Sequence, residues 1–149
     1  MKKLVIATDG SAPAKEAVDF GLEVAAEQGA DVTFVHVVPV DEYAVFGRPS
    51  GTMPIVHAEP VDDSETALNE AAEAAKAAGI AYSLERISAP TVDGILSIAD
   101  KQNADLIVVG SRGRGAVGAA LLGSVSRDLV RRAKRPVLVV KTTRVPVEA

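Results

Sequence analysis

Glycines in the C-terminal third of the chain are spaced so that backbone, and not side chains, would face a ligand. Gly110 and Gly113 are separated by two residues, and the pair Gly123-Ser124 follows after nine more. An apolar run ends at Gly110, and a helix-compatible run follows Ser124. Glycine lets N–H groups approach oxygen atoms without a Cβ in the way, and a helix start adds unpaired N–H groups and a positive dipole end. The spacing predicts a strand, a phosphate-binding loop and a helix, a site suited to a polyphosphate.

The charge of the chain is concentrated around this loop. The formal net charge is -4, which argues against a general nucleic-acid binder, yet the segment from Arg112 to Arg135 holds seven basic residues and one acid, Asp128. That segment therefore carries +6 and the remainder -10, an asymmetry that would steer an anion toward the glycines. A structural alternative stays open for the last four basic residues, because cations are also favoured in the final turn of a helix. They are Arg131, Arg132, Lys134 and Arg135.

Two familiar nucleotide motifs do not fit. Gly113, Gly115 and Gly118 form a literal G-x-G-x-x-G, but a dinucleotide site needs this motif after the first strand of its unit and an acid about 20 residues on. Here the next strand is the last one and it ends in Lys141, so NAD is not expected. The sequence also lacks G-x-x-x-x-G-K-[ST], so P-loop phosphoryl transfer is not expected.

Three further residues have two interpretations each. Ser124 could cap its helix, donate a hydrogen bond to phosphate, or do both. Asp9, in the sequence Asp9-Gly10-Ser11, could serve only the turn or could accept from ribose hydroxyls. His36 lies in an apolar run and is expected to be a core residue and not a ligand. No set of residues has metal-ligand spacing, and no nucleophile and base can be paired, so we assign no catalytic residue and no protein metal site.

The elements that must position these residues alternate along the chain. The first predicted helix has Ala14 to Ala25 on its apolar face and ends at Gly29. Three more helices are predicted at Ser64–Ala78, at Thr91–Gln102 with Thr91 as the N-cap, and at Ser124–Ala133. Strands between them make a parallel sheet with helices on both faces, and ligands bind such sheets beyond the carboxyl ends of the strands. The loops Thr8–Ser11, Val37–Pro39 and Gly110–Ser124 all lie at such ends. The predicted strands are Lys3–Thr8, Asp31–Val38, Ile80–Ile87, Ala104–Val109 and Pro136–Lys141.

Length and composition set the remaining limits. We expect residues 1–149 to form one domain with an ordinary hydrophobic core, without disulfides because there is no cysteine. The N-terminal apolar run is too short for a signal peptide or a membrane span, so we expect a cytoplasmic protein without membrane insertion. Residues 39–63 form a long variable loop with five Gly or Pro residues after Pro39, and they are either a lid over the ligand or an irregular surface segment.

Taken together, these motifs resemble the ATP-binding branch of the universal stress protein family. The resemblance is carried by VIATDGS near the N-terminus, by the spaced glycines with Gly123-Ser124, and by PVLVV after them, and it extends from Lys3 to Lys141. It implies a Rossmann-like α/β fold, an open five-stranded parallel sheet of order 3-2-1-4-5. It also implies ATP as the ligand, with Mg²⁺ brought in on the phosphates.

The resemblance assigns roles residue by residue around the nucleotide. The backbone of Ala7 and the side chain of Asp9, with Thr8 between them, would flank the adenosine, and Val37 would pair with the adenine edge through its main chain. The positions expected along the ribose and phosphates are Val109, Gly110, Gly113, Gly123, Ser124 and Val125. Arg112 is added from its place in the loop and not from the family motif.

The function expected from this reasoning is that of an ATP-binding stress-response regulator, acting by nucleotide-dependent conformation or by recruiting a protein partner that the sequence does not identify. The alternatives are an enzyme, a slow ATP hydrolase or nucleotidyl transferase using Asp9 with Arg112 and Arg114, and a structural protein with an empty pocket. The last strand is apolar from Val137 through Leu138 and Val139 to Val140, and an open apolar edge favours pairing. We therefore expect a homodimer through this strand.

Overall fold

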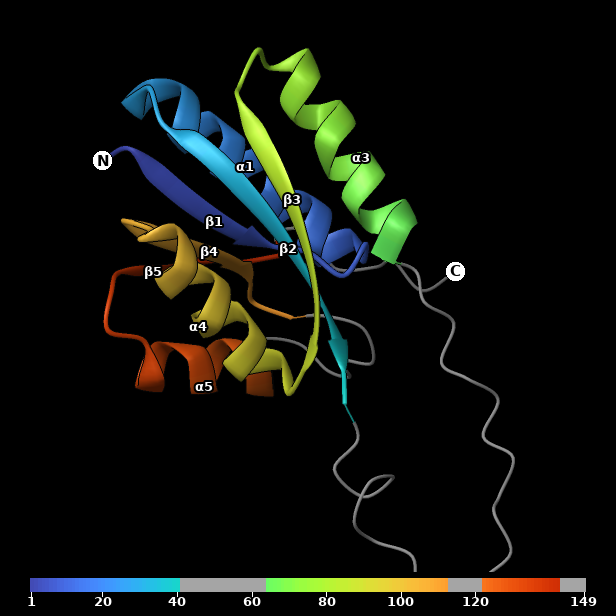
Figure 1. Ribbon diagram of the computed structural model, residues 1–149, viewed down its shortest axis with the longest axis vertical. Helices are drawn as coiled ribbons and strands as arrows, with labels where there is room; N and C mark the ends of the chain where they lie inside the picture. Colours follow the sequence, from blue (N-terminus) through green and yellow to red (C-terminus); the bar gives the residue numbers. More distant parts are fainter. Residues whose placement is uncertain (41–63, 113–121, 143–149) are drawn as a thin grey trace, which may run out of the picture.

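The computed structural model describes residues 1–40, 64–112 and 122–142, and strands and helices alternate through these ranges (Figure 1). The expected segment 39–63 falls outside the described residues except for Pro39 and Val40, and so does Gly113. None of the helices within the described ranges has the length and apolar character needed to cross a membrane. The elements are β1 Lys3–Ala7, α1 Ala12–Gln28, β2 Asp31–Pro39, α3 Ser64–Ala77, β3 Tyr82–Ala89, α4 Thr91–Gln102, β4 Leu106–Gly110, α5 Ser124–Arg132 and β5 Val137–Val140.

The five strands form one parallel sheet in the order β3-β2-β1-β4-β5, which confirms the predicted fold class and strand order. β1 lies in the centre, with Ala7 opposite Val35 of β2 and Ile6 opposite Val108 of β4. The order reverses at β1, because the chain moves outward to β2 and β3 and then returns to β4. β1 and β4 are therefore neighbours whose following loops leave the sheet on opposite faces, the geometry that opens a ligand crevice in such folds.

Helices cover both faces of the sheet, as Figure 1 shows. One face packs against α1 and α3 around the buried side chains of Ile6 and Phe34, and the other packs against α4 and α5 around Val5, Ile107 and Leu129. Central strands therefore alternate between two apolar cores, which is why their sequences are continuous apolar runs and not alternating ones.

The ends of the helices and strands follow the local sequence, and the main differences are the starts of α4, β3 and β4, the last at Leu106 and not at Ala104. Gly29 has φ 64° and ends α1 in the left-handed conformation expected of a glycine at this position. α4 begins one residue earlier than predicted, because Pro90 and not Thr91 occupies the N-cap, without a side-chain cap bond. β3 begins at Tyr82 and not at Ile80, whose N–H instead bonds the Ala75 carbonyl at the end of α3. Boundaries of this kind depend on which of two competing backbone hydrogen bonds forms. The periodicity of apolar residues in the sequence contains no information on this choice.

Candidate functional site

The carboxyl ends of β1 and β4 bring most of the predicted site residues to one edge of the sheet. Ala7 is the last residue of β1, and Thr8 and Asp9 follow it. Val109 and Gly110 end the neighbouring strand β4. Val37 lies two residues past the end of the β1 ladder on the other neighbour, β2. The sheet order therefore gathers residues that are up to 103 positions apart in the sequence, from Ala7 to Gly110.

A tight turn after β1 holds the Asp9 carboxylate at this edge. The Asp9 Oδ1 atom accepts the Ser11 N–H at 2.9 Å, and the buried Thr8 hydroxyl accepts the Gly10 N–H at 3.2 Å. Gly10 has φ 78°, a conformation that glycine adopts without strain. The Ser11 hydroxyl then accepts the Ala14 N–H at 3.3 Å and caps α1. Asp9 thus serves the turn after β1.

Gly110 lets the first turn of α1 approach the end of β4. A Cβ at Gly110 would stand 3.0 Å from the Pro13 carbonyl oxygen and 3.2 Å from the Arg112 carbonyl oxygen. Both neighbours are backbone atoms, which cannot rotate away as a side chain can. The glycine is therefore needed for packing at this point.

The loop between β4 and α5 is closed at its base by hydrogen bonds to one carbonyl. The Ser111 carbonyl accepts the Gly123 N–H at 2.7 Å and the Ser126 hydroxyl at 3.1 Å. The Ser126 Oγ atom also lies 3.0 Å from the Gly123 carbonyl oxygen. Ser111 and Ser126 are both buried. We call these three residues the loop clasp, and the clasp places the N-terminus of α5 directly beside the carboxyl end of β4.

The start of α5 tests the helix-cap interpretation of Ser124. Gly123 occupies the N-cap position, with φ -63° and ψ 163°, and Ser124 is the first helical residue. The cap residue has no side chain, so the Ser124 hydroxyl is not the helix cap. Ser124 and Val125 are exposed, and the Arg112 Cα lies 3.6 Å from where a Gly123 Cβ would stand. The helix N-terminus therefore presents its first N–H groups next to Arg112.

On the β2 side, a buried histidine joins the two strand ends. The His36 Nδ1 atom lies 2.9 Å from the Thr8 carbonyl oxygen, and the imidazole is 8% exposed. A carbonyl only accepts, so Nδ1 carries the hydrogen. The expectation that His36 is a satisfied buried residue is confirmed, but its partner belongs to the candidate site.

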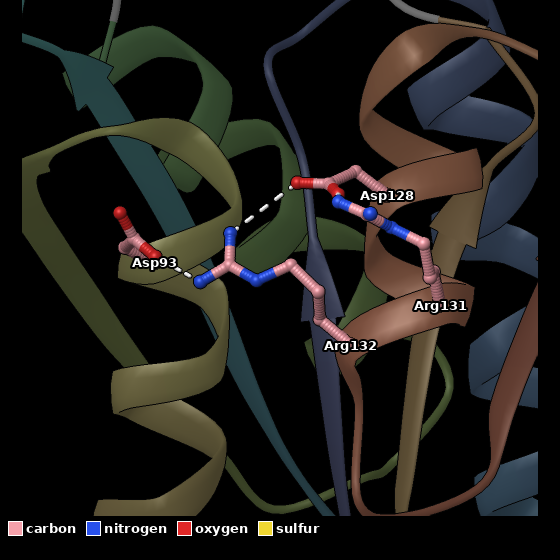
Figure 2. A network of polar contacts seen from close by, with 4 residues as sticks. All are labelled: Asp93, Asp128, Arg131 and Arg132. Atoms are coloured by element: carbon pink, nitrogen blue, oxygen red, sulfur yellow. Dashed lines mark hydrogen bonds and ion pairs between the residues drawn. The ribbon is translucent and has the colours of Figure 1, made fainter.

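A network of charged side chains fixes the far end of α5 to α4 (Figure 2). Arg132 bridges Asp93 at the start of α4 and Asp128 on its own helix. The hydrogen bond from Arg131 is the main cause that lowers the pKa of the Asp128 carboxyl, and the bond to Asp93 is the main cause that raises the pKa of Arg132. Arg131 and Arg132 are thus engaged in ion pairs at the C-terminal half of α5, which agrees with the structural alternative for these two residues.

Sequence reasoning did not single out the residues of the loop clasp other than Gly123. Ser111 and Ser126 are small polar residues one and two positions from motif residues, and their burial, which the sequence does not report, gives them their role. Within the ranges that the structure describes, no group of three or more His, Cys, Asp or Glu side chains is placed to hold a metal ion.

Comparison with known proteins gives a consistent result over more than nine tenths of the chain. The model of the universal stress protein family matches residues 1–141. A universal stress protein of Methanocaldococcus jannaschii is 33% identical over 141 residues, which cover 94% of this chain and 82% of the relative. The crystal structure of a universal stress protein in complex with cAMP is 29% identical with a TM-score of 0.69, covering 93% of this chain and 95% of that one. A universal stress protein of Archaeoglobus fulgidus in complex with dAMP is 26% identical with a TM-score of 0.69, covering 95% and 98%.

Proposed function

Because the chain belongs to the universal stress protein family, we propose that it is an ATP-binding stress-response regulator that acts through nucleotide-dependent conformation or through a recruited partner. Nucleotide binding is supported by the relatives with cAMP and dAMP, both adenine nucleotides. ATP in particular is supported by the glycine motif and by the helix start beside it.

The observation that carries the proposal is the loop clasp. It holds the N-terminus of α5 against the end of β4 through the Ser111 carbonyl, whichever path the intervening loop takes. A helix N-terminus that is fixed at the carboxyl edge of a parallel sheet is suited to phosphate, since its N–H groups and dipole point at the ligand. Gly123, Ser124 and Val125 would contribute these groups, with Gly113 and Arg112 on the loop before them.

The adenosine would lie across the ends of β1, β2 and β4. Asp9 would accept from the ribose hydroxyls, and the main chain of Val37 would pair with the adenine edge. Ala7, Thr8, Val109 and Gly110 would line the path between base and phosphates. Mg²⁺ would enter with the phosphates, held by ATP and water more than by protein side chains.

The test is a substitution that affects the fold and the ligand in opposite directions. Ser124→Glu places a carboxylate in the first turn of α5, which stabilises a helix by about 0.3–1 kcal/mol. The same charge repels the phosphates. We therefore expect a raised or unchanged free energy of unfolding in urea, but weaker ATP binding and unchanged adenosine binding by isothermal titration calorimetry.

The matched control is Val130→Glu, which changes the net charge equally at a residue that is 51% exposed in the same helix but away from its start. Equal losses of ATP affinity in the two variants would reduce the effect to net charge, and no loss in Ser124→Glu would remove the phosphate site from this helix. The nucleotide released from freshly purified protein by heat should be ATP; mostly ADP or AMP would favour the hydrolase alternative.

For the assembly, we propose a homodimer through β5, which is one of the two edge strands of the sheet. The Val140 carbonyl accepts the Ser111 N–H and so faces β4, and alternation then directs the N–H and C=O of Val137 and Val139 to the open edge. Val139→Pro removes one outward N–H and no ladder bond to β4. We expect light scattering to give a dimer for the wild type and a monomer for this variant; a wild-type monomer at micromolar concentration would refute the dimer.

A further inference from the structure

The ladder between β1 and β2 stops at a step that involves two site residues. The Asp31 N–H donates to the Lys2 carbonyl and the Thr8 N–H donates to the Val35 carbonyl, so odd-numbered residues of β2 direct their N–H and C=O toward β1. The next bond in this pattern would run from the Val37 N–H to the Thr8 carbonyl. Among the described residues that bond is not formed, although Val37 still belongs to β2.

The Thr8 carbonyl has a different donor, the His36 side chain. The His36 Nδ1 atom lies 2.9 Å from this oxygen. Since both groups are buried, the carbonyl needs a donor, and the imidazole supplies one from the same strand that would otherwise have supplied the Val37 N–H. The imidazole thus substitutes for one step of the ladder.

We infer that His36 is a specificity-determining residue, which satisfies the Thr8 carbonyl so that the Val37 N–H and C=O remain available to read the edge of the base. One donor beside one acceptor matches adenine, whose N1 accepts and whose N6 amino group donates. Hypoxanthine presents N1–H and O6 instead and mismatches both. The inference rests on the proposed nucleotide site and adds the residue that keeps the Val37 N–H and C=O available to the base.

Removing the imidazole donor should lead the Val37 N–H to bond the Thr8 carbonyl, so that this N–H is no longer available to the base. In His36→Leu, the Thr8 carbonyl lacks its side-chain donor, and the nearest donor in the ladder pattern is the Val37 N–H. The adenine N1 would then lose its partner. Asparagine carries its amide nitrogen two bonds from Cβ, as histidine carries Nδ1, so His36→Asn should keep the donor and the open edge.

The first measurement is the ratio of ITP to ATP dissociation constants by calorimetry. We expect a preference for ATP in the wild type and in His36→Asn, and a fall of about tenfold in the ratio for His36→Leu, equal to about 1.4 kcal/mol. Thr33→Val is the matched control, because it removes another side-chain hydrogen bond from β2, the 2.9 Å contact of Thr33 Oγ1 with Ser83 Oγ, away from the carboxyl ends of the strands. A general loss of stability would weaken both nucleotides equally, and an unchanged ratio in His36→Leu would overturn the inference.

The second measurement needs neither nucleotide nor variant. Hydrogen exchange by NMR on the ligand-free protein should show a Val37 amide that exchanges much faster than the Val35 amide, which lies within the ladder. A Val37 amide as protected as that of Val35 would overturn the inference. If the wild type binds neither ATP nor ITP while the Val37 amide is open, the proposed function fails and the specificity role of His36 fails with it, while a protected Val37 amide in a protein that binds ATP overturns the inference alone.

Discussion

Substitution of Gly110 by alanine tests whether local packing at the candidate site affects ATP affinity independently of the stability of the whole domain. The added Cβ would stand 3.0 Å from the Pro13 carbonyl oxygen, closer than ordinary van der Waals contact, so the first turn of α1 must shift by a few tenths of an ångström. Overpacking of this kind costs about 1–3 kcal/mol. Replacing a glycine inside a strand returns about 0.5–1 kcal/mol, because the unfolded chain loses freedom. The net expectation is a loss of about 1 kcal/mol, within a range of about 0–2.5 kcal/mol, in the free energy of unfolding.

The shift also moves the turn that carries Asp9 relative to the end of β4. If one hydrogen bond to the ligand is loosened, the cost is about 0.5–1.5 kcal/mol, or about two- to tenfold in Kd for ATP. The matched control is Gly29→Ala. A Cβ there meets nothing within 4 Å, but φ is 64°, and the left-handed conformation costs a residue other than glycine about 1–2 kcal/mol. Gly29 also lies at the opposite edge of the sheet, before β2.

The two variants should therefore lose similar stability in urea denaturation, while only Gly110→Ala loses ATP affinity in calorimetry at a temperature where both are folded. Equal losses of affinity would show that binding follows global stability and would refute the local reasoning. Unchanged stability and affinity in Gly110→Ala would show that the close approach of α1 to β4 is not required.

Three other perturbations have defined outcomes. Ser126→Ala should lower the free energy of unfolding by only about 0.5–1.5 kcal/mol in urea, because both carbonyls that its hydroxyl contacts keep a backbone donor; a loss far above this range would mean that the loop clasp collapses. Two backbone N–H groups lower the pKa of the Asp105 carboxyl, so its stabilising contribution is complete above the ordinary pKa of about 3.9 and is lost as pH falls through the lowered value. Asp105→Asn should therefore remove part of the decline in melting temperature between pH 5 and pH 2. The same decline in the variant as in the wild type would contradict this. Arg132→Gln should lower the melting temperature in dilute buffer and have less effect in about 1 M salt, where the Debye length is about 3 Å; an equal effect in both would argue against an electrostatic role.

The helices, the strands and the parallel α/β class could be predicted from the sequence. Apolar runs indicate strands that are buried on both faces, and helical periodicity indicates helices that are buried on one face. The strand order was reached through the family resemblance, and the register that the order creates is tertiary. The capping of α4 by Pro90 and the later start of β3 were missed, because competing backbone partners decide them.

For the candidate site, the sequence by itself determined which residue types stand at the strand ends: glycines where backbone must approach backbone or a ligand, Asp9 in a turn, and Ser124 at a helix start. These are local properties, set by φ, side-chain size and capping chemistry. Only the tertiary structure decided that Gly123 and not Ser124 is the cap, and that Ser111 and Ser126 close the loop. It also decided that His36 bonds Thr8, 28 positions away in sequence. Such contacts depend on which strands become neighbours and on their register, and a hydrogen bond between distant residues leaves no periodic signal in either of their segments.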